Sequence, residues 1–346
     1  MLPHRAPEEL RCWALAALGA ADSGKSPRLS PVAGDASARR YFRLHLDGAS
    51  YVAVEAPPAT EKNAAFIQVA ALLSARGVKV PAVYHADLEH GYLLLEDLGD
   101  RLLLPVLRPA SVDHYYRRAM ELLVTMAGPP CVTSGLENYD RTLLSEELGR
   151  FPRWFVRGLL GYEPDGAEQR LLDAVSSRLI DSALEQPRVL VHRDFHSRNL
   201  MLTADDELAV IDFQDAVAGP ITYDLVSLLR DCYIQWPAAQ VDQWARDYHG
   251  LLVSRDLLAA TDEATFMRWF DLMGLQRHVK VLGTFARLYL RDGKSSYLDD
   301  LPLVIHYVSE IVEKYAGEEA VFADFGSWFS GALSPLIAQQ DWSRKQ

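Results

Sequence analysis

Near its middle the chain reads His192-Arg193-Asp194-Phe195-His196-Ser197-Arg198-Asn199, and Ile211-Asp212-Phe213-Gln214 follows soon after. Both polar segments adjoin short runs of apolar residues, which is typical of loops that join β-strands. Turn-forming residues separate the last two apolar runs, so we expect these runs to form a β-hairpin. The strands are expected at residues 189–191, 200–202 and 208–211, with the turn at 204–207.

This arrangement predicts where three polar side chains lie. Asp194 follows the first strand, Asn199 begins the hairpin and Asp212 lies just past its end, so we expect all three at one edge. Carboxylate and amide oxygens suit Mg²⁺, which keeps several waters and binds substrate phosphates. A second carboxylate can then orient and deprotonate a hydroxyl group.

The rest of the chain divides into two regions. Alternating apolar and polar residues before residue 96 predict a small antiparallel sheet, whereas helical periodicity dominates after residue 101. The strands are expected at 28–32, 40–46, 51–56, 83–86 and 92–95, with a helix at 61–76. Later helices are expected at 112–126, 143–160, 167–184, 223–234, 238–253, 264–289 and 303–314. We therefore expect an α+β fold with an N-terminal lobe (1–96), a helical C-terminal lobe (97–346) and a boundary near residues 96–99.

The pattern H-x-D-x-x-x-x-N followed by I-D-F resembles the catalytic and metal-binding loops of the protein-kinase-like fold, in its aminoglycoside phosphotransferase branch. His196 matches the second His of the branch's H-G-D-x-H-x-x-N loop, although Arg193 replaces the usual Gly. Residues 219–225 resemble the branch's D-P-x-Y-D-L element, and residues 93–99 resemble the hinge between the lobes. The resemblance covers roughly residues 29–229.

The resemblance implies ATP and Mg²⁺ as cofactors and assigns roles to individual residues. Asp194 would be the catalytic base, with Asn199 and Asp212 as Mg²⁺ ligands. The implied nucleotide-binding residues are Gly34, Asp35, Ser37, Arg40, Glu96 and Leu98. His192 and Asp224 would support the loop, and His196 would either support it or contact a phosphate.

The sequence departs from the protein-kinase pattern in the third strand, which reads Tyr51-Val52-Ala53-Val54-Glu55-Ala56. Protein kinases carry a Lys there that holds the α- and β-phosphates. We expect Arg39, Arg40 or Arg43 on the neighbouring strand to replace that cation. The alternative is a pseudokinase that binds nucleotide without turnover.

Further similarity lies in Gly34-Asp35-Ala36-Ser37 with Arg39-Arg40-Tyr41-Phe42-Arg43, in Ala56-Pro57-Pro58, and in residues 212–216 leading to residues 223–233. These segments look like the anomeric N-acetylmuramate/N-acetylglucosamine kinases of bacterial cell-wall recycling. The implied reaction converts ATP and an amino sugar to ADP and the sugar 1-phosphate. A kinase acting on an aminoglycoside, choline or homoserine remains the alternative within the same class.

The helical lobe carries candidate sugar contacts. A guanidinium would suit the lactyl carboxylate of N-acetylmuramate, and an aromatic ring could stack on the sugar. The candidates are Arg153, Trp154, Arg230, Asp231 and Arg277. Glu146 and Glu147 are expected on a solvated helix face rather than as a sugar clamp.

Composition narrows the function further. The formal net charge of −12 argues against nucleic acid or an anionic membrane as the main partner.

Cys12, Cys131 and Cys232 are odd in number and lack Cys-x-x-Cys spacing, so we expect buried thiols and a cytoplasmic protein. Residues 19–26 fit G-x-x-x-x-G-K-[ST], but they follow an expected helix at 10–18 and precede Pro27, so we expect a plain loop. The sequence leaves the oligomeric state open.

Overall fold

A computed structural model describes residues 8–21, 27–32, 38–128, 135–258 and 261–344. The chain forms two compact units, one of Met1–Arg108 with Arg198–Ala216 and the other of Pro109–Ser197 with Val217–Gln346. This division differs from the single boundary expected near residues 96–99. The reason is packing within the first unit, where Leu98 forms an apolar cluster with Met201 and Ala209 of the distant hairpin. We call the first unit the sheet unit and the second the helical unit.

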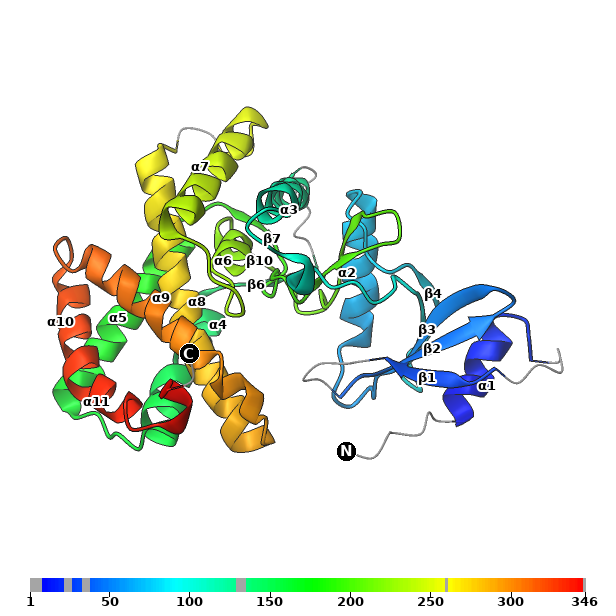
Figure 1. The fold of residues 1–346 in the computed structure, drawn as a ribbon, viewed down its shortest axis with the longest axis horizontal. Helices are drawn as coiled ribbons and strands as arrows, with labels where there is room; N and C mark the ends of the chain where they lie inside the picture. The colour runs from blue at the N-terminus through cyan, green and yellow to red at the C-terminus, as the bar shows by residue number, and fades with distance from the viewer. Residues whose placement is uncertain (1–7, 22–26, 33–37, 129–134, 259–260, 345–346) are drawn as a thin grey trace. The chain divides into compact units, whose positions relative to one another are not determined.

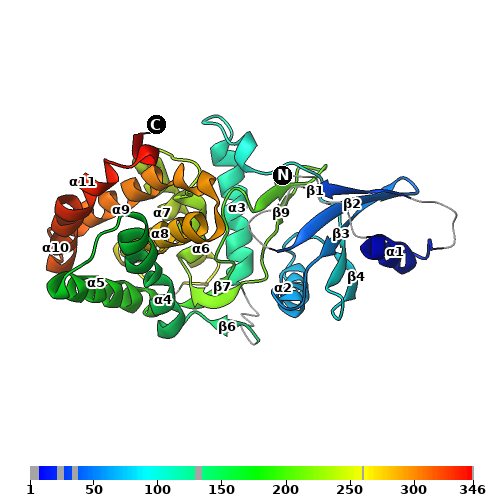
Figure 2. The ribbon, with the colours of Figure 1, turned by 90° about the horizontal axis from the view of Figure 1, so that it is seen from below.

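The sheet unit is built on five antiparallel strands in the order β1-β2-β3-β5-β4. They are β1 Leu29–Val32, β2 Arg40–Leu46, β3 Ala49–Glu55, β4 Val83–Asp87 and β5 Tyr92–Glu96. Two helices accompany the sheet, α1 Glu8–Ala17 and α2 Asn63–Ala75 (Figure 2). Strand and helix bounds lie within a few residues of those predicted, because the apolar periodicity of each segment is regular.

The two faces of this sheet have different roles. Phe42, Leu44 and Ala53 pack against Leu10 and Ala14 of α1, so this face belongs to the apolar core. Successive side chains of a strand point to opposite faces. The intervening positions of β2 and β3 therefore point to the other face, where a pocket lies.

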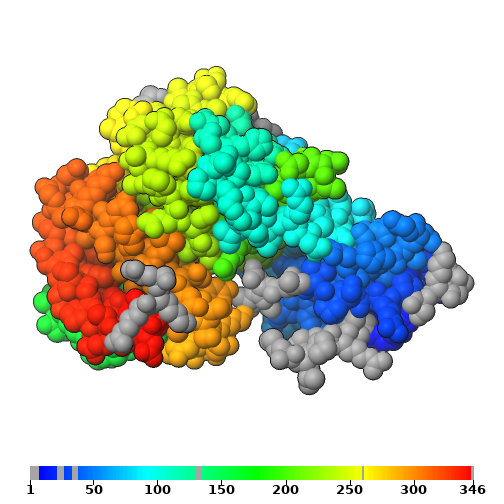
Figure 3. Space-filling view, in the orientation of Figure 1, coloured from blue at the N-terminus to red at the C-terminus, as the bar shows by residue number. Residues whose placement is uncertain are grey.

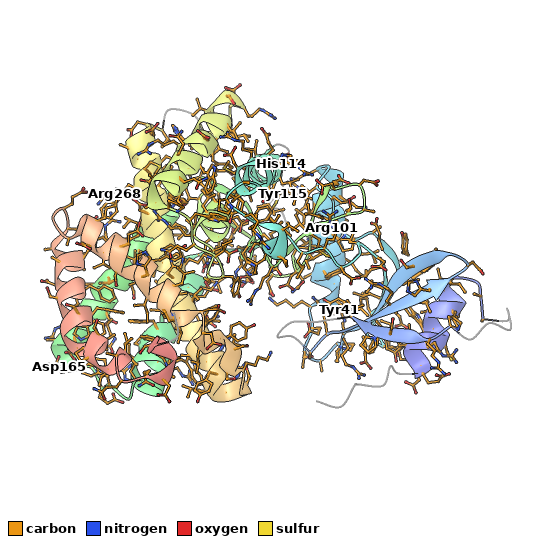
Figure 4. All side chains as sticks on the ribbon, in the orientation of Figure 1. Tyr41, Arg101, His114, Tyr115, Asp165 and Arg268 are labelled. Atoms are coloured by element: carbon orange, nitrogen blue, oxygen red, sulfur yellow. The ribbon has the colours of Figure 1, made fainter. Side chains whose placement is uncertain are left out.

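A hairpin completes the sheet unit. Its strands are β8 Leu200–Leu202 and β9 Leu208–Val210, as the sequence predicts. Leu103 donates its backbone N–H to the Leu200 carbonyl at 2.8 Å. Arg101, which is labelled in Figure 4, pairs with Asp206 in the hairpin turn at 3.1 Å. A single helical turn, η1 Leu104–Val106, lies beside these contacts.

The helical unit contains a small sheet in the order β6-β10-β7. Its strands are β6 Glu137–Asn138, β7 Arg188–Val191 and β10 Val217–Pro220. The sequence pattern predicts β7 but not β10, whose pairing with β7 joins residues that are distant along the chain.

Helices make up most of this unit, and the long helix α8 runs through it in contact with α5, α6 and α9 (Figure 1). The helices are α3 Val112–Ala127, α4 Arg141–Leu148, α5 Gly166–Leu184, α6 Tyr223–Leu229, α7 Ala238–Ser254, α8 Glu263–Asp292, α9 Leu301–Tyr315, α10 Ala320–Trp328 and α11 Ser334–Ile337. Shorter turns are η2 Phe151–Leu159, η3 Ser295–Leu298, η4 Phe329–Leu333 and η5 Asp341–Arg344. The surface formed by the last helices, coloured orange to red, is continuous in Figure 3.

Local capping explains where two of these helices begin. Asp165, labelled in Figure 4, accepts the backbone N–H groups of Ala167 and Glu168, and Glu168 accepts the N–H of Asp165 in return. This reciprocal cap satisfies N–H groups that a helix start leaves without partners. Asp262 caps α8 in a similar way by accepting the Thr265 N–H at 2.7 Å.

Three expectations are wrong. The helix expected at 143–160 is broken, because Pro152 cannot donate a backbone hydrogen bond and the π-helical turn η2 replaces the α-helix there. The helix α6 ends at Leu229 rather than at residue 234, since the Asp231 carboxylate accepts the Tyr233 N–H. Cys12 is exposed because it lies on the side of α1 away from the core, although Cys232 is buried as expected.

Cys131, and residues 22–26 of the G-x-x-x-x-G-K-[ST] pattern, lie outside the described residues. No helix in the described part of the chain is both long enough and apolar enough to cross a membrane.

Candidate active site

The sheet unit contains a pocket of about 310 Å³. It lies on the sheet face opposite α1. The pocket is lined by residues of the strands β1, β2, β3 and β5, by Pro81, by the segment after β5, by the helix α2, and by the hairpin with the residues that flank it. The lining residues include Tyr41, Arg43, Val52, Phe66, Glu96, Leu98, Asn199 and Asp212. Every residue that lines the pocket belongs to the sheet unit.

The expected hinge residues line this pocket. Glu96 ends β5, and its carboxylate accepts hydrogen bonds from the Lys79 ammonium at 2.6 and 2.8 Å. The same carboxylate accepts the Ala82 backbone N–H at 3.1 Å. Leu98 is buried against the hairpin, which fixes the backbone on either side of it. These contacts hold the segment 96–98 as a rigid wall of the pocket.

Asn199 and Asp212 lie close together at the pocket. The Asn199 Nδ2 and Asp212 Oδ2 atoms are 3.5 Å apart, and the Ile211 N–H donates to the Asn199 carbonyl at 3.1 Å. Gln214 donates to Asp212 Oδ1 at 2.8 Å. Asp212 has a φ of +63°, a conformation uncommon for residues other than glycine. Two hard oxygen donors in this arrangement fit Mg²⁺, which completes its shell with water and phosphate oxygens.

Arg40 lies on the other face of the sheet. It is opposite Glu55 in the β2–β3 register, pairs with that carboxylate and has its guanidinium 5.8 Å from the Phe42 ring centroid. Phe42 packs against α1. The structure therefore separates Arg40 from the pocket, contrary to the nucleotide-binding role expected for it. Gly34, Asp35 and Ser37 lie outside the described residues.

In the helical unit, Asp194 lies in a loop that Asp224 supports. The Asp224 carboxylate accepts the backbone N–H groups of His192 at 2.6 Å and Arg193 at 2.9 Å. The buried His192 ring accepts the Asp194 N–H through Nδ1 at 3.2 Å. Burial raises the pKa of Asp224 to about 6, against the opposing effects of His192 and these N–H groups. Asp224 and His192 thus both form hydrogen bonds to the backbone of this loop.

The surroundings of Asp194 are cationic. Burial on its own would raise the pKa of Asp194, but Lys280, His196 in its protonated form at low pH, Arg193 and Arg277 lower it to about 2. The carboxylate is therefore ionised near neutral pH. His196 is itself buried, and burial lowers its pKa so that its ring is neutral near pH 7.

Glu147 is fully buried beside this loop, so the expectation of a solvated position is wrong. Arg193 and Tyr139 donate to its carboxylate, and the Lys280 ammonium lies 3.2 Å away. Burial would raise the pKa of Glu147, but Lys280, Arg193 and Tyr139 outweigh burial and lower it to about 2. Glu147 shares a face of α4 with Leu144 and Leu148, which are buried, and this spacing is the signal that predicts its position.

Two candidate sugar contacts form buried internal bonds instead. Arg230 donates to Asp271 at 2.7 Å, and its guanidinium lies 4.4 Å from the Phe270 ring centroid. The Asp231 carboxylate accepts the Ser197 N–H at 3.0 Å as well as the Ser197 hydroxyl. Both side chains therefore form buried hydrogen bonds within the helical unit.

The other three candidates are placed differently. Arg277 on α8 contributes to the positive potential at Asp194 and donates to the Cys232 thiol at 3.3 Å. Arg153 is exposed on η2 and lies 5.2 Å above the half-buried Trp154 ring. Arg277 thus shares the surroundings of Asp194, whereas the other two form a surface pair.

A sequence profile of the phosphotransferase enzyme family (APH) matches residues 28–263, which is more than half of the chain. The chain belongs to this family. The matched range includes the loop of Asp194 and the hairpin residues Asn199 and Asp212, which are the residues that carry the resemblance in the sequence. The phosphotransferase has an antiparallel sheet in its N-terminal part and a mostly helical remainder, as expected for the protein-kinase-like fold.

Relatives of this phosphotransferase include two proteins named N-acetylmuramate/N-acetylglucosamine kinase. The protein of Pseudomonas putida is 41% identical over 82% of this chain and 83% of its own length. The protein of Pseudomonas aeruginosa is 40% identical over 89% of this chain and 92% of its own length.

Solved structures share the fold at lower sequence identity. The choline kinase LicA from Streptococcus pneumoniae has a TM-score of 0.59 at 16% identity, covering 90% of this chain and 99% of its own. An aminoglycoside phosphotransferase, APH(2'')-Ib with ADP bound, has a TM-score of 0.56 at 14% identity, covering 88% and 99%.

Proposed function

We propose that this phosphotransferase uses ATP to phosphorylate the anomeric hydroxyl of N-acetylmuramate, N-acetylglucosamine or both, and yields the sugar 1-phosphate for peptidoglycan recycling. The observation that carries this proposal is the cationic surroundings of Asp194, to which Lys280, Arg193 and Arg277 contribute. The two Pseudomonas relatives that carry the name of this activity support it.

Charge distinguishes this acceptor from those of other members of the fold. Aminoglycosides and choline are cations. Arg193 and Lys280 have the Glu147 carboxylate as a counter-charge, whereas Arg277 donates to an uncharged thiol, so the Arg277 guanidinium would repel a cationic acceptor. N-Acetylmuramate carries a lactyl carboxylate, and the phosphorylated product of either amino sugar is an anion. A guanidinium binds such groups in a bidentate manner. We assign that contact to Arg277, whose guanidinium acts on Asp194 and has the neutral Cys232 thiol as its hydrogen-bond partner.

In the proposed reaction, Asp194 acts on the anomeric hydroxyl. The anomeric oxygen attacks the γ-phosphorus of ATP, the bond to the β,γ-bridging oxygen breaks, ADP leaves, and Asp194 takes the hydroxyl proton. A pKa of about 2 makes Asp194 a weak base. It suffices because an anomeric hydroxyl is more acidic than an ordinary alcohol and because the transition state for phosphoryl transfer is loose.

The sheet unit supplies the nucleotide site in this proposal. The pocket beside Glu96 and Leu98 has the size and the apolar walls that an adenine requires. Asn199 and Asp212 would hold Mg²⁺, which would supply positive charge to the phosphate oxygens. The cytoplasm, where ATP is available and thiols stay reduced, is the compartment that we propose.

The proposal is tested by measuring ADP release from Mg·ATP with a panel of acceptors. We expect release with N-acetylmuramate or N-acetylglucosamine, and background release with kanamycin, choline or no acceptor. If ADP were released only with kanamycin or choline, that compound and not an amino sugar would be the acceptor. Binding of ATP without release for any acceptor in the panel would favour a pseudokinase.

A further inference from the structure

The third strand of the sheet unit lacks a cation on its pocket face. Val52 lines the pocket, and by the alternation of a strand Val54 shares that face, whereas Ala53 packs toward α1. Kinases of this fold place on this strand a Lys that holds the α- and β-phosphates and pairs with a Glu on the next helix. If the sheet unit binds ATP as proposed, another side chain has to supply this charge.

Three arginines are candidates, Arg39 just before β2 and Arg40 and Arg43 on it, and the alternation of side chains places them on two sides. Tyr41 and Arg43 line the pocket, so alternation places Arg39 on the same side and Arg40 on the other. Arg40 pairs with Glu55, directly opposite it in the register. This leaves Arg39 and Arg43.

Arg43 is held beside the hinge. Its guanidinium donates to Asp97 at 2.6 and 2.9 Å and to Asp100 at 2.9 Å. The two carboxylates offset its positive charge. Arg43 therefore braces the segment that follows β5, which is where the base or ribose of a nucleotide would lie.

Arg39 lies beside the residues that mark the metal site. Its guanidinium is 5.2 Å from the Phe66 ring centroid, and the Phe66 and Phe213 rings are 4.7 Å apart. Phe213 follows the predicted Mg²⁺ ligand Asp212 in the sequence. Phe66, Phe213 and Asp212 all line the pocket. Because Mg²⁺ binds phosphate oxygens, this is where the phosphates of a nucleotide would lie.

Glu61 holds Arg39 in this position. The Arg39 Nε and Glu61 Oε2 atoms are 3.2 Å apart, and the side chains expose only 1% and 11% of their areas. Glu61 also accepts the Ala38 backbone N–H at 3.1 Å, so one carboxylate fixes both the backbone and the guanidinium. Glu61 lies just before α2, so the pair joins the start of β2 to the start of the helix. A Lys–Glu pair between strand and helix makes the same connection in the kinases.

We propose that Arg39 supplies the phosphate-binding cation that the third strand lacks, with Glu61 as its positioning residue. This inference rests on the proposed use of ATP, but it does not depend on the identity of the acceptor. A planar guanidinium suits this contact because it can donate to two phosphate oxygens together.

The test compares the affinities of adenosine, ADP and Mg·ATP in single variants by calorimetry. In Arg39→Met we expect ADP and Mg·ATP to bind at least about tenfold more weakly while adenosine affinity stays within about twofold, since adenosine has no phosphate. Arg39→Lys should recover part of the loss because it keeps the charge. Glu61→Gln should weaken ADP less than Arg39→Met does. Arg101→Met, which removes an exposed arginine of the same unit, should leave all three affinities unchanged.

Three results would overturn the inference. The first is an equal loss of adenosine and ADP affinity in Arg39→Met, which would assign a purely structural role. The second is unchanged ADP affinity in that variant. The third is a larger loss of ADP affinity in Arg40→Met or Arg43→Met while adenosine affinity in that variant stays within about twofold of the wild type. Arg39-dependent ADP binding in a protein that phosphorylates neither amino sugar would support the inference and overturn only the proposed acceptor.

Discussion

Arg193 pairs with the buried carboxylate of Glu147 from a backbone conformation that residues other than glycine rarely adopt. Its φ is +77°, and the loop that the sequence resembles usually carries glycine at this position. The arginine side chain exposes 14% of its area and the glutamate none. The ion pair thus fastens the loop of Asp194 to α4 and offsets the cost of the strained backbone.

Arg193→Gly is expected to destabilise the protein even though it relieves the strain. Removing one partner of a buried ion pair costs about 3–5 kcal/mol, and relief of the left-handed conformation returns about 1–2 kcal/mol. We expect the free energy of unfolding in urea to fall by about 2 kcal/mol. Arg193→Ala keeps the strain and should be less stable than Arg193→Gly by about 1 kcal/mol. A glycine variant as stable as the wild type would contradict the role given to this ion pair.

Asp194→Asn tests the assignment of the base. A positioned general base contributes about 10²–10⁴-fold to rate, so we expect kcat to fall by about 10³-fold. ADP affinity, measured by calorimetry, should stay within about twofold, because the residues that line the nucleotide pocket belong to the sheet unit. Near-normal turnover in this variant would show that another group takes the proton.

Lys280 is expected to control the acid side of the pH profile. With a pKa of about 2, Asp194 is in its basic form throughout the neutral range and loses that form only as the pH falls toward 2. In Lys280→Met the pKa of Asp194 should rise, because this ammonium has the largest effect among the charges that lower it. We expect the acid limb of kcat/KM to move to higher pH, and Lys280→Arg to keep the limb of the wild type. An identical profile in all three proteins would contradict this electrostatic account.

The G-x-x-x-x-G-K-[ST] pattern at residues 19–26 is expected to have no part in catalysis. The helix that precedes it, α1, takes the place of the strand that a phosphate-binding loop of this kind requires. Lys25→Ala should therefore keep kcat and the KM for ATP within about twofold of the wild type. A loss of turnover of a hundredfold or more would instead indicate a second nucleotide site around Lys25.

Much of the fold follows from local sequence patterns. Alternation of apolar residues predicts β2 and β5, and helical spacing predicts α3, α5 and α8 to within a few residues. The strand β10 is not predicted, because its pairing with β7 depends on contacts between distant residues. The break at Pro152 is a matter of backbone chemistry that apolar spacing alone does not show.

Some site residues can be identified from a local motif, whereas the places of others depend on tertiary packing. The motif around Asp194 identifies the loop because its residue types are fixed by chemistry. Sequence alone leaves Arg39, Arg40 and Arg43 equivalent. The strand register sets Arg40 apart, and the ion-pair partners then distinguish Arg39 from Arg43. Arg230 and Asp231 have side chains that suit sugar contacts, but both are buried, and they form hydrogen bonds with Asp271 and Ser197 respectively. Whether a polar side chain faces a ligand or the core depends on tertiary packing, which local patterns do not encode.

The most direct test of the central claim is the position of the phosphate on the product. Phosphorus NMR of a complete reaction with N-acetylmuramate or N-acetylglucosamine should show one sugar phosphate coupled to the anomeric proton. One ADP should form per sugar, and the reducing end should disappear. A phosphate on another hydroxyl with the reducing end intact, or no phosphorylated amino sugar at all, would contradict the claim.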